Sequence, residues 1–278
     1  MSDPPPRRRR LRNLTERIQK VLARAGLGSR REVERWIREG RVTVNNRPAE
    51  LGQQIDPSCQ VAVDGRSVAL ASTPSVPARI LLYHKPVGQI CSRDDPQGRP
   101  TVFDSLPRLR GRRWVSVGRL EINTSGLLVF TTDGELAHRL MHPSTGIERE
   151  YRCRVRGNPG ERELKRLLTG VTLGGQLCRF ELVEAGRGSG ANRWFRVVLR
   201  EGRNREVRRM WQSVGSTVSR LIRVRYGPFQ LERQHHTGES IELSESQSAK
   251  LLQSAGGAQA SARVQKSGRK RPGTRHRR

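Results

Sequence analysis

The segment GRLEINTSG places a single carboxylate between a basic residue and a run of hydroxyl-bearing and glycine residues. Glu121 lies two residues after Arg119 and three before Thr124. A carboxylate in a loop can act as a nucleophile or exchange a proton with a substrate. The flanking stretches VSVGRL and GLLVFTT are rich in β-branched and aromatic residues and predict two strands. We therefore expect Glu121 in a loop at a sheet edge, where functional residues are common.

Other segments with suggestive spacing lack the context that their chemistry needs. Gly186, Gly188 and Ala191 have the spacing of a dinucleotide-binding loop, but they join two strand-like stretches and open no helix, which favours a hairpin loop. His138 and His142 stand four residues apart, but no glutamate follows His138 and a proline ends the helix. The sequence has neither a nucleophile elbow nor a P-loop, so we expect no metal and no cofactor.

The cysteines and the hydropathy pattern bear on the compartment. Cys59, Cys91, Cys153 and Cys178 are far apart and form no CxxC pair, which predicts free, buried thiols in a reducing compartment. No apolar run approaches the roughly 20 residues of a membrane span. Because the first residues show no apolar stretch of a secretory signal, we expect a cytoplasmic protein without a membrane partner.

The net charge of the chain points to a polyanionic partner. The 278 residues carry 54 Lys and Arg against 26 Asp and Glu, a formal charge of +28. Residues 1–12 contribute +4 and residues 262–278 contribute +8, so the remaining body is itself basic at +16. This balance excludes a generic acidic cytosolic enzyme and favours a nucleic acid or an acidic membrane as partner.

Composition divides the chain into domains. We expect a basic disordered arm over 1–14, a small domain over 15–70, a linker over 71–78, a larger domain over 79–253 and a basic disordered tail over 254–278. Helices and strands do not alternate regularly in the larger domain, which predicts an α+β fold with a mixed sheet and flanking helices.

The small domain combines two helices with short strand pairs. Thr15 is predicted to cap the first helix, and Ser29 with Glu32 forms a capping box for the second. Asn45-Asn46 and Asp64-Gly65 predict tight hairpin turns. The stretch ERIQKVLARAGLGSRREVERWIREGRVTVNNRPAE resembles the S4 RNA-binding domain, which implies RNA as the partner. The candidate RNA-binding residues are Lys20, Arg24, Arg30, Arg31, Arg35 and Arg41.

The larger domain begins with the strand ILLYHKP, whose KPVG then turns. YRCRVRG alternates buried and basic positions and predicts a half-buried strand with a basic face. Helix PGERELKRLLTG is expected to turn Leu164, Leu167 and Leu168 inward, and Asp133 is expected to cap a short helix. A further helix carries the apolar stripe Val207, Met210, Trp211 and Val214, and a closing helix is expected around 244–252.

Three segments of the larger domain resemble the pseudouridine synthases of the small-subunit and large-subunit rRNA branch. VGRLEINTSGLLVFTTDGELAHRLMHP resembles the first motif of that family, while EREY and EGRNREVRRM followed by SRLIRVRYGP resemble its second and third motifs. DPQGRPTVFD and NREVRRMW are most similar to the large-subunit members. The resemblance covers about residues 15 to 245, including the order of the two domains.

The resemblance implies a cofactor-free isomerase that flips a uridine of large-subunit rRNA, free or in an assembling subunit, and rejoins the base through C5. It assigns the catalytic positions to Glu121, Tyr151 and Arg208, the last as the cation that pairs with the carboxylate. Arg119 fills the space of the flipped nucleotide, and Leu221 packs under the uracil. Further arginines grip phosphates. We assign them to Arg203, Arg205 and Arg223, and we expect a monomer.

One departure from the family pattern leaves the activity open. The family carries Asp where this chain has Glu121, and a side chain longer by one methylene moves the carboxylate by more than an ångström, which can cost about 100-fold in rate. Glu121 can work in an adjusted loop, the protein can be an rRNA-binding or ribosome-assembly factor of low or no activity, or the position carries an exchange peculiar to this chain. A basic DNA-binding protein is a third class, but no recognition-helix motif supports it.

Overall fold

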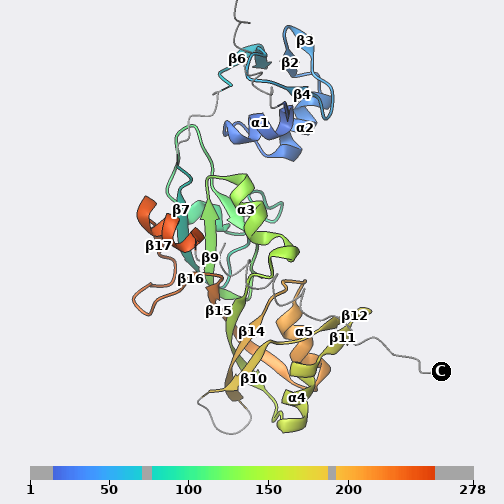
Figure 1. The fold of residues 1–278 in the computed structure, drawn as a ribbon, viewed down its shortest axis with the longest axis vertical. Helices are drawn as coiled ribbons and strands as arrows, with labels where there is room; N and C mark the ends of the chain where they lie inside the picture. The colour runs from blue at the N-terminus through green and yellow to red at the C-terminus, as the bar shows by residue number, and fades with distance from the viewer. Residues whose placement is uncertain (1–14, 71–76, 187–191, 254–278) are drawn as a thin grey trace, which may run out of the picture. The chain divides into compact units, whose positions relative to one another are not determined.

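The computed structural model describes residues 15–70, 77–186 and 192–253, which form two compact units (Figure 1). The first unit contains residues 15–70 together with 109–113, and the second contains the remainder. The grouping of 109–113 with the first unit was not expected from the sequence. The predicted arm and tail, most of the linker and the loop over 187–191 lie outside the described residues.

The first unit packs two helices against short antiparallel strands. Its elements are α1 (Ile18–Arg24), α2 (Arg30–Arg38), β1 (Glu16–Arg17), β2 (Val42–Val44), β3 (Arg47–Pro48), β4 (Gln54–Ile55), β5 (Val61–Val63) and β6 (Arg66–Val68). Ile18 and Leu22 of α1 meet Val33 and Ile37 of α2 in a core closed by Val61. This helical spacing of apolar residues agrees with the pattern in the sequence.

Of the two helix caps predicted in the first unit, the cap of α2 is confirmed and the cap of α1 is wrong. The capping box of α2 is confirmed, since the Ser29 hydroxyl accepts from the Glu32 amide at 3.1 Å and Glu32 Oε2 accepts from the Ser29 amide at 2.6 Å. Thr15 does not cap α1. Residues 16–17 pair with β4 as an extended strand, so the helix begins only at Ile18, and the Thr15 hydroxyl donates to Gln54 at 2.6 Å.

Both predicted hairpin turns of the first unit are confirmed. Asn45 and Asn46 have φ of 49° and 63° between β2 and β3, and Asp64 and Gly65 have φ of 50° and 73° between β5 and β6. Two successive residues with positive φ are the signature of the turn whose twist matches that of the strands.

A mixed sheet forms the body of the second unit. Its central order is β13-β14-β10-β15-β9-β7-β17, with β16 paired to β15 and β8 paired to β9. The strands are β7 (Ile80–Lys85), β8 (Val115–Val117), β9 (Ser125–Thr131), β10 (Arg149–Arg156), β13 (Leu182–Ala185), β14 (Asn192–Leu199), β15 (Thr217–Tyr226), β16 (Phe229–Gln230) and β17 (Ser240–Glu242). Among these described strands, only β9 and β15 pair in parallel. The predicted hairpin between β13 and β14 is confirmed by their antiparallel pairing.

Helices and a small hairpin flank this sheet. They are α3 (Gly134–Met141), α4 (Glu161–Thr169), α5 (Glu206–Ser213), a helix over 245–253, the 3₁₀ turns η1 (Val102–Ser105) and η2 (Pro143–Thr145), and the hairpin of β11 (Val171–Leu173) with β12 (Gln176–Cys178). Asp133 caps α3 as predicted, since its Oδ1 accepts from the amides of Glu135 and Leu136. No helix within the described ranges is long and apolar enough to cross a membrane.

The burial of the leucines of α4 differs from the prediction at one position. Leu167 is buried and Leu164 is partly buried, but Leu168 is 40% exposed. The expectation that all three face inward is therefore wrong for Leu168. The stripe on α5 is confirmed more fully, with Trp211 packed on Phe195 at a ring separation of 4.8 Å.

A close backbone approach joins the two parallel strands. Gly126, at the start of β9, has φ of 109° and pairs with Arg223 of β15. A Cβ at this position would lie 2.2 Å from the backbone oxygen of Arg223, so only glycine fits. This close approach brings the loop before β9 beside β15.

Candidate active site

A cleft of about 750 Å³ opens within the second unit. Its walls come from the segment 90–99, the loop 118–124 and the start of α5, and its floor comes from β10 and β15. Pockets of this volume accommodate small-molecule or nucleotide-sized ligands. Seven of the eight catalytic and substrate-binding residues assigned from the sequence in this domain line the cleft, and the eighth, Arg208, contacts Glu121, which does.

Glu121 lies in the cleft wall with one oxygen bound and the other unbound. Oε2 accepts from Arg208 Nε and from Arg205 Nη1, each at 3.0 Å. Within the described residues, Oε1 accepts no hydrogen bond, and a quarter of the side chain is exposed. Charge-assisted hydrogen bonds from two guanidinium groups to one oxygen fix the orientation of the carboxylate, which leaves Oε1 available to a ligand.

The position of this loop in the sheet differs from the prediction. The loop does not lie at a sheet edge, because β9, which it precedes, is a central strand between β7 and β15. The error came from treating β8 and β9 as an isolated pair. β9 is flanked by β15 and β7, and Glu121 lines the same cleft as Leu221 of β15 and Tyr151 of β10.

Hydrogen bonds anchor every backbone carbonyl of residues 121–124. Lys85 Nζ donates to the carbonyls of Glu121 at 3.1 Å and Thr124 at 2.9 Å. The Gly88 amide donates to the carbonyl of residue 122, and Arg208 Nη2 donates to that of residue 123, both at 2.9 Å. The loop is therefore positioned independently of any ligand, as precise catalytic geometry requires.

Lys85 is the residue of this site that the sequence reasoning missed. Its side chain is fully buried at the end of β7, and Nζ also donates to the carbonyl of Pro86 at 2.9 Å. Burial lowers the pKa of Lys85. A signal was present in the sequence, since Lys85 continues the alternation of the buried Leu81 and Tyr83 and therefore points to the same side of the strand.

Arg208 and Arg205 approach Glu121 from the start of α5. Arg208 also donates from Nη1 to the Val218 carbonyl at 2.9 Å, so it joins the loop to β15. Arg205 precedes the helix in a left-handed conformation with φ of 52°. A non-glycine residue in this region is uncommon and concentrates at functional sites. The conformation directs the Arg205 side chain to Glu121.

Tyr151, Leu221 and Arg223 form the floor. In the antiparallel pair of β10 and β15, Tyr151 lies opposite Arg223, and Leu221 lies opposite Cys153. Leu221 and Tyr151 are buried and line the cleft. The Tyr151 hydroxyl has no hydrogen-bond partner among the described residues, although a tyrosine packed only for stability normally has one. The hydroxyl is therefore available to a ligand.

Arg223 and Arg119 retain binding capacity in different ways. Arg223 is buried and donates from Nε to the Leu127 carbonyl at 2.8 Å, while its Nη2 is buried without a partner in the described structure. Such an orphaned donor is costly unless a ligand accepts from it. Arg119 is exposed and lines the cleft, and the described residues offer it no acidic partner.

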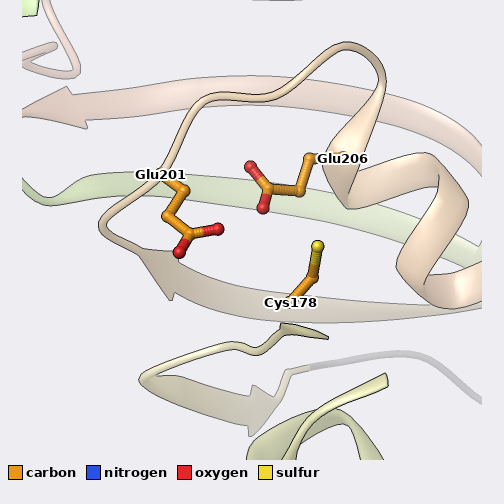
Figure 2. Close-up of side chains that lie close together, drawn as sticks. All are labelled: Cys178, Glu201 and Glu206. Carbon is orange, nitrogen blue, oxygen red and sulfur yellow. The ribbon is translucent and has the colours of Figure 1, made fainter. Parts of the chain in front are cut away.

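Arg203 lies in a cluster with Cys178, Glu201 and Glu206, whose side chains point toward one another in Figure 2. Arg203 Nη1 donates to Cys178 Sγ at 3.0 Å, to Glu206 at 3.3 Å and to Glu201. The guanidinium thus provides the cation that these acidic groups surround. The expectation that Arg203 is free to grip phosphate is weakened, because its charge is already neutralised; its contacts indicate that it shapes the loop before α5.

The segment 90–99 completes the cleft wall. Asp95 pairs with Arg99 at 2.6 Å, and the side-chain hydrogen bonds from Arg99 lower the pKa of Asp95 to about 2. Cys91 Sγ accepts from the Leu120 amide at 3.4 Å and lines the cleft. All four cysteines are free thiols as predicted, but the expectation that they are buried is confirmed only for Cys153 and Cys178, because Cys59 and Cys91 are partly exposed. Burial raises the pKa of Cys153, on the same side of β10 as Tyr151, to about 12.

The predicted RNA-binding residues of the first unit fall into two groups, those in close ion pairs and those exposed on or beside α2. Lys20 and Arg24 both contact Glu16, at 3.0 and 2.6 Å, and Arg41 contacts Asp64 at 2.7 Å. The remaining predicted residues are all exposed on or beside α2, where Arg35 lies 3.7 Å from Glu39; they are Arg30, Arg31 and Arg35.

Comparisons with known proteins identify the family of the chain. The sequence profile of the family described as RNA pseudouridylate synthase matches residues 79–213, and that of the S4 domain matches residues 16–61. The ribosomal large subunit pseudouridine synthase B of Vibrio cholerae is 54% identical over 231 residues, which cover 83% of this chain and 72% of that protein. The protein of the same name from Escherichia coli K12 is 51% identical, with 83% and 80% covered.

Two further comparisons bear on length and fold. The protein of that name from Pseudomonas aeruginosa is 53% identical, and the match spans 83% of this chain but only 60% of that protein. A crystal structure described as pseudouridylate synthase superimposes with a TM-score of 0.58 at 25% identity, covering 84% of this chain and 99% of that one.

The chain belongs to the RNA pseudouridylate synthase family, a family of isomerases, and carries an S4 domain ahead of its synthase domain. This confirms the family and the α+β fold class that the motifs indicated.

Proposed function

We propose that this protein converts a uridine of large-subunit ribosomal RNA to pseudouridine, with Glu121 as the reacting carboxylate. One observation carries the proposal: Glu121 presents an unbound oxygen to a nucleotide-sized cleft while two arginines hold its other oxygen. The geometry therefore favours an active enzyme over a non-catalytic rRNA-binding factor.

The reaction rearranges the substrate without redox change. The bond between N1 of the base and C1′ of the ribose breaks, a bond between C5 and C1′ forms, C5 loses its proton and N1 gains one. An anionic oxygen can support this rearrangement by adding to C1′ or to the ring and leaving again. Glu121 Oε1 is the candidate for that oxygen.

Tyr151 and Leu221 are proposed to receive the flipped base. Leu221 offers an apolar surface under the ring, and Tyr151 offers a hydroxyl to which the described residues supply no partner. A hydroxyl at that place can assist the proton transfer from C5. Arg223 Nη2, buried and unsatisfied, is proposed to donate to an oxygen of the nucleotide.

The substrate is proposed from the relatives and from charge. Relatives at 51–54% identity are named for the large ribosomal subunit. Arg119 and Arg205 at the cleft, the basic first unit and the charge of +28 suit an RNA backbone. We place the protein in the cytoplasm as a monomer acting on free rRNA or an assembling subunit.

The test is a map of pseudouridines in large-subunit rRNA from cells with and without the gene for this chain. We expect one pseudouridine to disappear when the gene is deleted and to return with the wild-type gene. An identical map in both strains would contradict the proposed activity and leave a binding role.

A further inference from the structure

The sheet of the second unit has a basic face opposite the cleft. Side chains alternate across a strand. On β10, Tyr151 belongs to the cleft side with Cys153, whereas Arg152, Arg154 and Arg156 belong to the other side. All three arginines are exposed. Helix α5 covers the first side, where its Trp211 meets Phe195, the partner of Cys153.

Neighbouring strands extend this basic face. Arg154 lies opposite Arg220 of β15 on one side and opposite Trp194 of β14 on the other. Arg220 is exposed and Trp194 is partly exposed. Directly opposed side chains in a sheet lie about 5 Å apart, so like charges there destabilise the pair. We call the set Arg152, Arg154, Arg156, Arg220 and Trp194 the basic sheet face.

Acidic residues near this face are already paired with other arginines. Glu150 accepts from Arg196 at 2.7 Å and from Arg225 at 3.1 Å, and Glu184 accepts from Arg196 at 2.8 Å. Across the described ranges, by contrast, the four arginines of the basic sheet face have no acidic partner. An unpaired cluster that costs stability in the free protein is stabilised by an anionic ligand.

We infer that the basic sheet face is a second RNA-binding surface, which contacts phosphates of the substrate RNA outside the segment held in the cleft. Arginines at alternate positions of a strand are about 6.7 Å apart and present a row of charges to a backbone. Trp194 beside them provides a surface on which a base can stack. The large exposed apolar residues of the described structure all lie elsewhere, which argues against a lipid or an apolar protein partner.

The test compares two variants that lose the same charge. Arg152→Gln with Arg154→Gln and Arg156→Gln removes the row on β10. Arg162→Gln with Lys165→Gln and Arg166→Gln removes three exposed charges from α4 and is the control. We would measure RNA binding as a function of salt concentration with two RNAs. One is a full-length large-subunit rRNA transcript, and the other is a 20-nucleotide hairpin of it that contains the modified uridine.

For the long RNA, we expect the β10 variant to bind about 10- to 100-fold more weakly at 0.1 M salt. Its salt slope should fall by about 2 to 3, since each phosphate that the protein neutralises contributes roughly 0.7–0.9. The α4 control should show the wild-type slope on the long RNA. The β10 variant should show the wild-type slope on the short hairpin. Trp194→Ala should weaken binding to the long RNA without changing the slope. Equal slopes for both triple variants would overturn the inference, since only net charge would then matter.

The outcome is separable from the proposed function. Pseudouridine formation on the short hairpin at saturating protein should be unchanged in the β10 variant, because the altered side chains do not line the cleft. If the wild-type protein modified no RNA, the proposed function would fail, while the difference in salt slope would still decide whether the basic sheet face binds RNA.

Discussion

Replacing Lys85 by methionine tests whether the loop of Glu121 is positioned by the buried ammonium. The substitution preserves length and removes the donor to three carbonyls, those of Pro86, Glu121 and Thr124. Hydrogen bonds from a charged donor contribute about 1.5–3 kcal/mol each. Relief from burying the charge returns several kcal/mol. We expect a net loss of about 2–4 kcal/mol, which a domain with about 5–15 kcal/mol of stability survives.

The loop should then shift without unfolding, because the hydrogen bonds of Gly88 and Arg208 to its other two carbonyls remain. A displacement near 1 Å costs about 100-fold in rate. The assay is single-turnover pseudouridine formation with saturating protein, alongside RNA affinity and urea unfolding. We expect the rate to fall about 100-fold while RNA affinity is kept. Lys165→Met, at an exposed position of α4, is the control and should change neither stability nor rate.

The pH dependence of this variant has a defined sign. Burial lowers the pKa of Lys85 in the folded state below its ordinary value near 10.4. Between those two values the unfolded state binds the extra proton, so the wild-type free energy of unfolding should rise with pH relative to Lys85→Met. A Lys85→Met protein with wild-type rate and stability, and a parallel pH profile, would refute the positioning role.

Three other predictions follow from single interactions. Gly126→Ala should destabilise the protein by about 2–4 kcal/mol in urea unfolding, because the new Cβ would meet the backbone of β15. Gly134→Ala is the control and should be neutral, because Gly134 has open space around it and a negative φ. Equal losses of stability in the two variants would contradict this prediction. Hydrogen bonds from Arg99 lower the pKa of Asp95 to about 2, so the stabilisation from this pair should be lost as the pH falls from about 4 to 2. An NMR titration of Asp95 measures this, and a titration midpoint at the ordinary value of an aspartate would contradict it. Cys91 should be alkylated in the free protein and protected by substrate RNA, and unchanged labelling would exclude a ligand in the cleft.

Local signals in the sequence predicted most elements of the fold. The capping box at Ser29 and the hairpins at Asn45-Asn46 and Asp64-Gly65 depend on neighbouring residues alone, and all are confirmed. Thr15 failed because pairing with a distant strand overrode its capping preference. The central place of β9 was likewise hidden, since it depends on β15, almost 100 residues later.

The same distinction between local signals and distant contacts applies to the residues of the site. Residue types and motif resemblance identified Glu121 and Arg208, and the structure brings them within 3.0 Å. The position of Lys85 on the buried side of its strand could be predicted from the alternation, but its role was missed because its three acceptors are backbone carbonyls, which no side-chain pattern marks. Arg203 was taken for a phosphate ligand, although Glu201 and Glu206 flank it in the sequence as they do in space.

The central claim, that Glu121 is the reacting carboxylate, is tested most directly by Glu121→Gln in single-turnover assays on a large-subunit rRNA fragment. The amide keeps the shape of the side chain but cannot supply an anionic oxygen, so pseudouridine formation should be abolished while RNA affinity changes little. Glu121→Asp, which restores the reach of the family's residue, should retain or raise the rate. Isomerisation by Glu121→Gln at the wild-type rate would contradict the account, because the reacting group would then lie elsewhere.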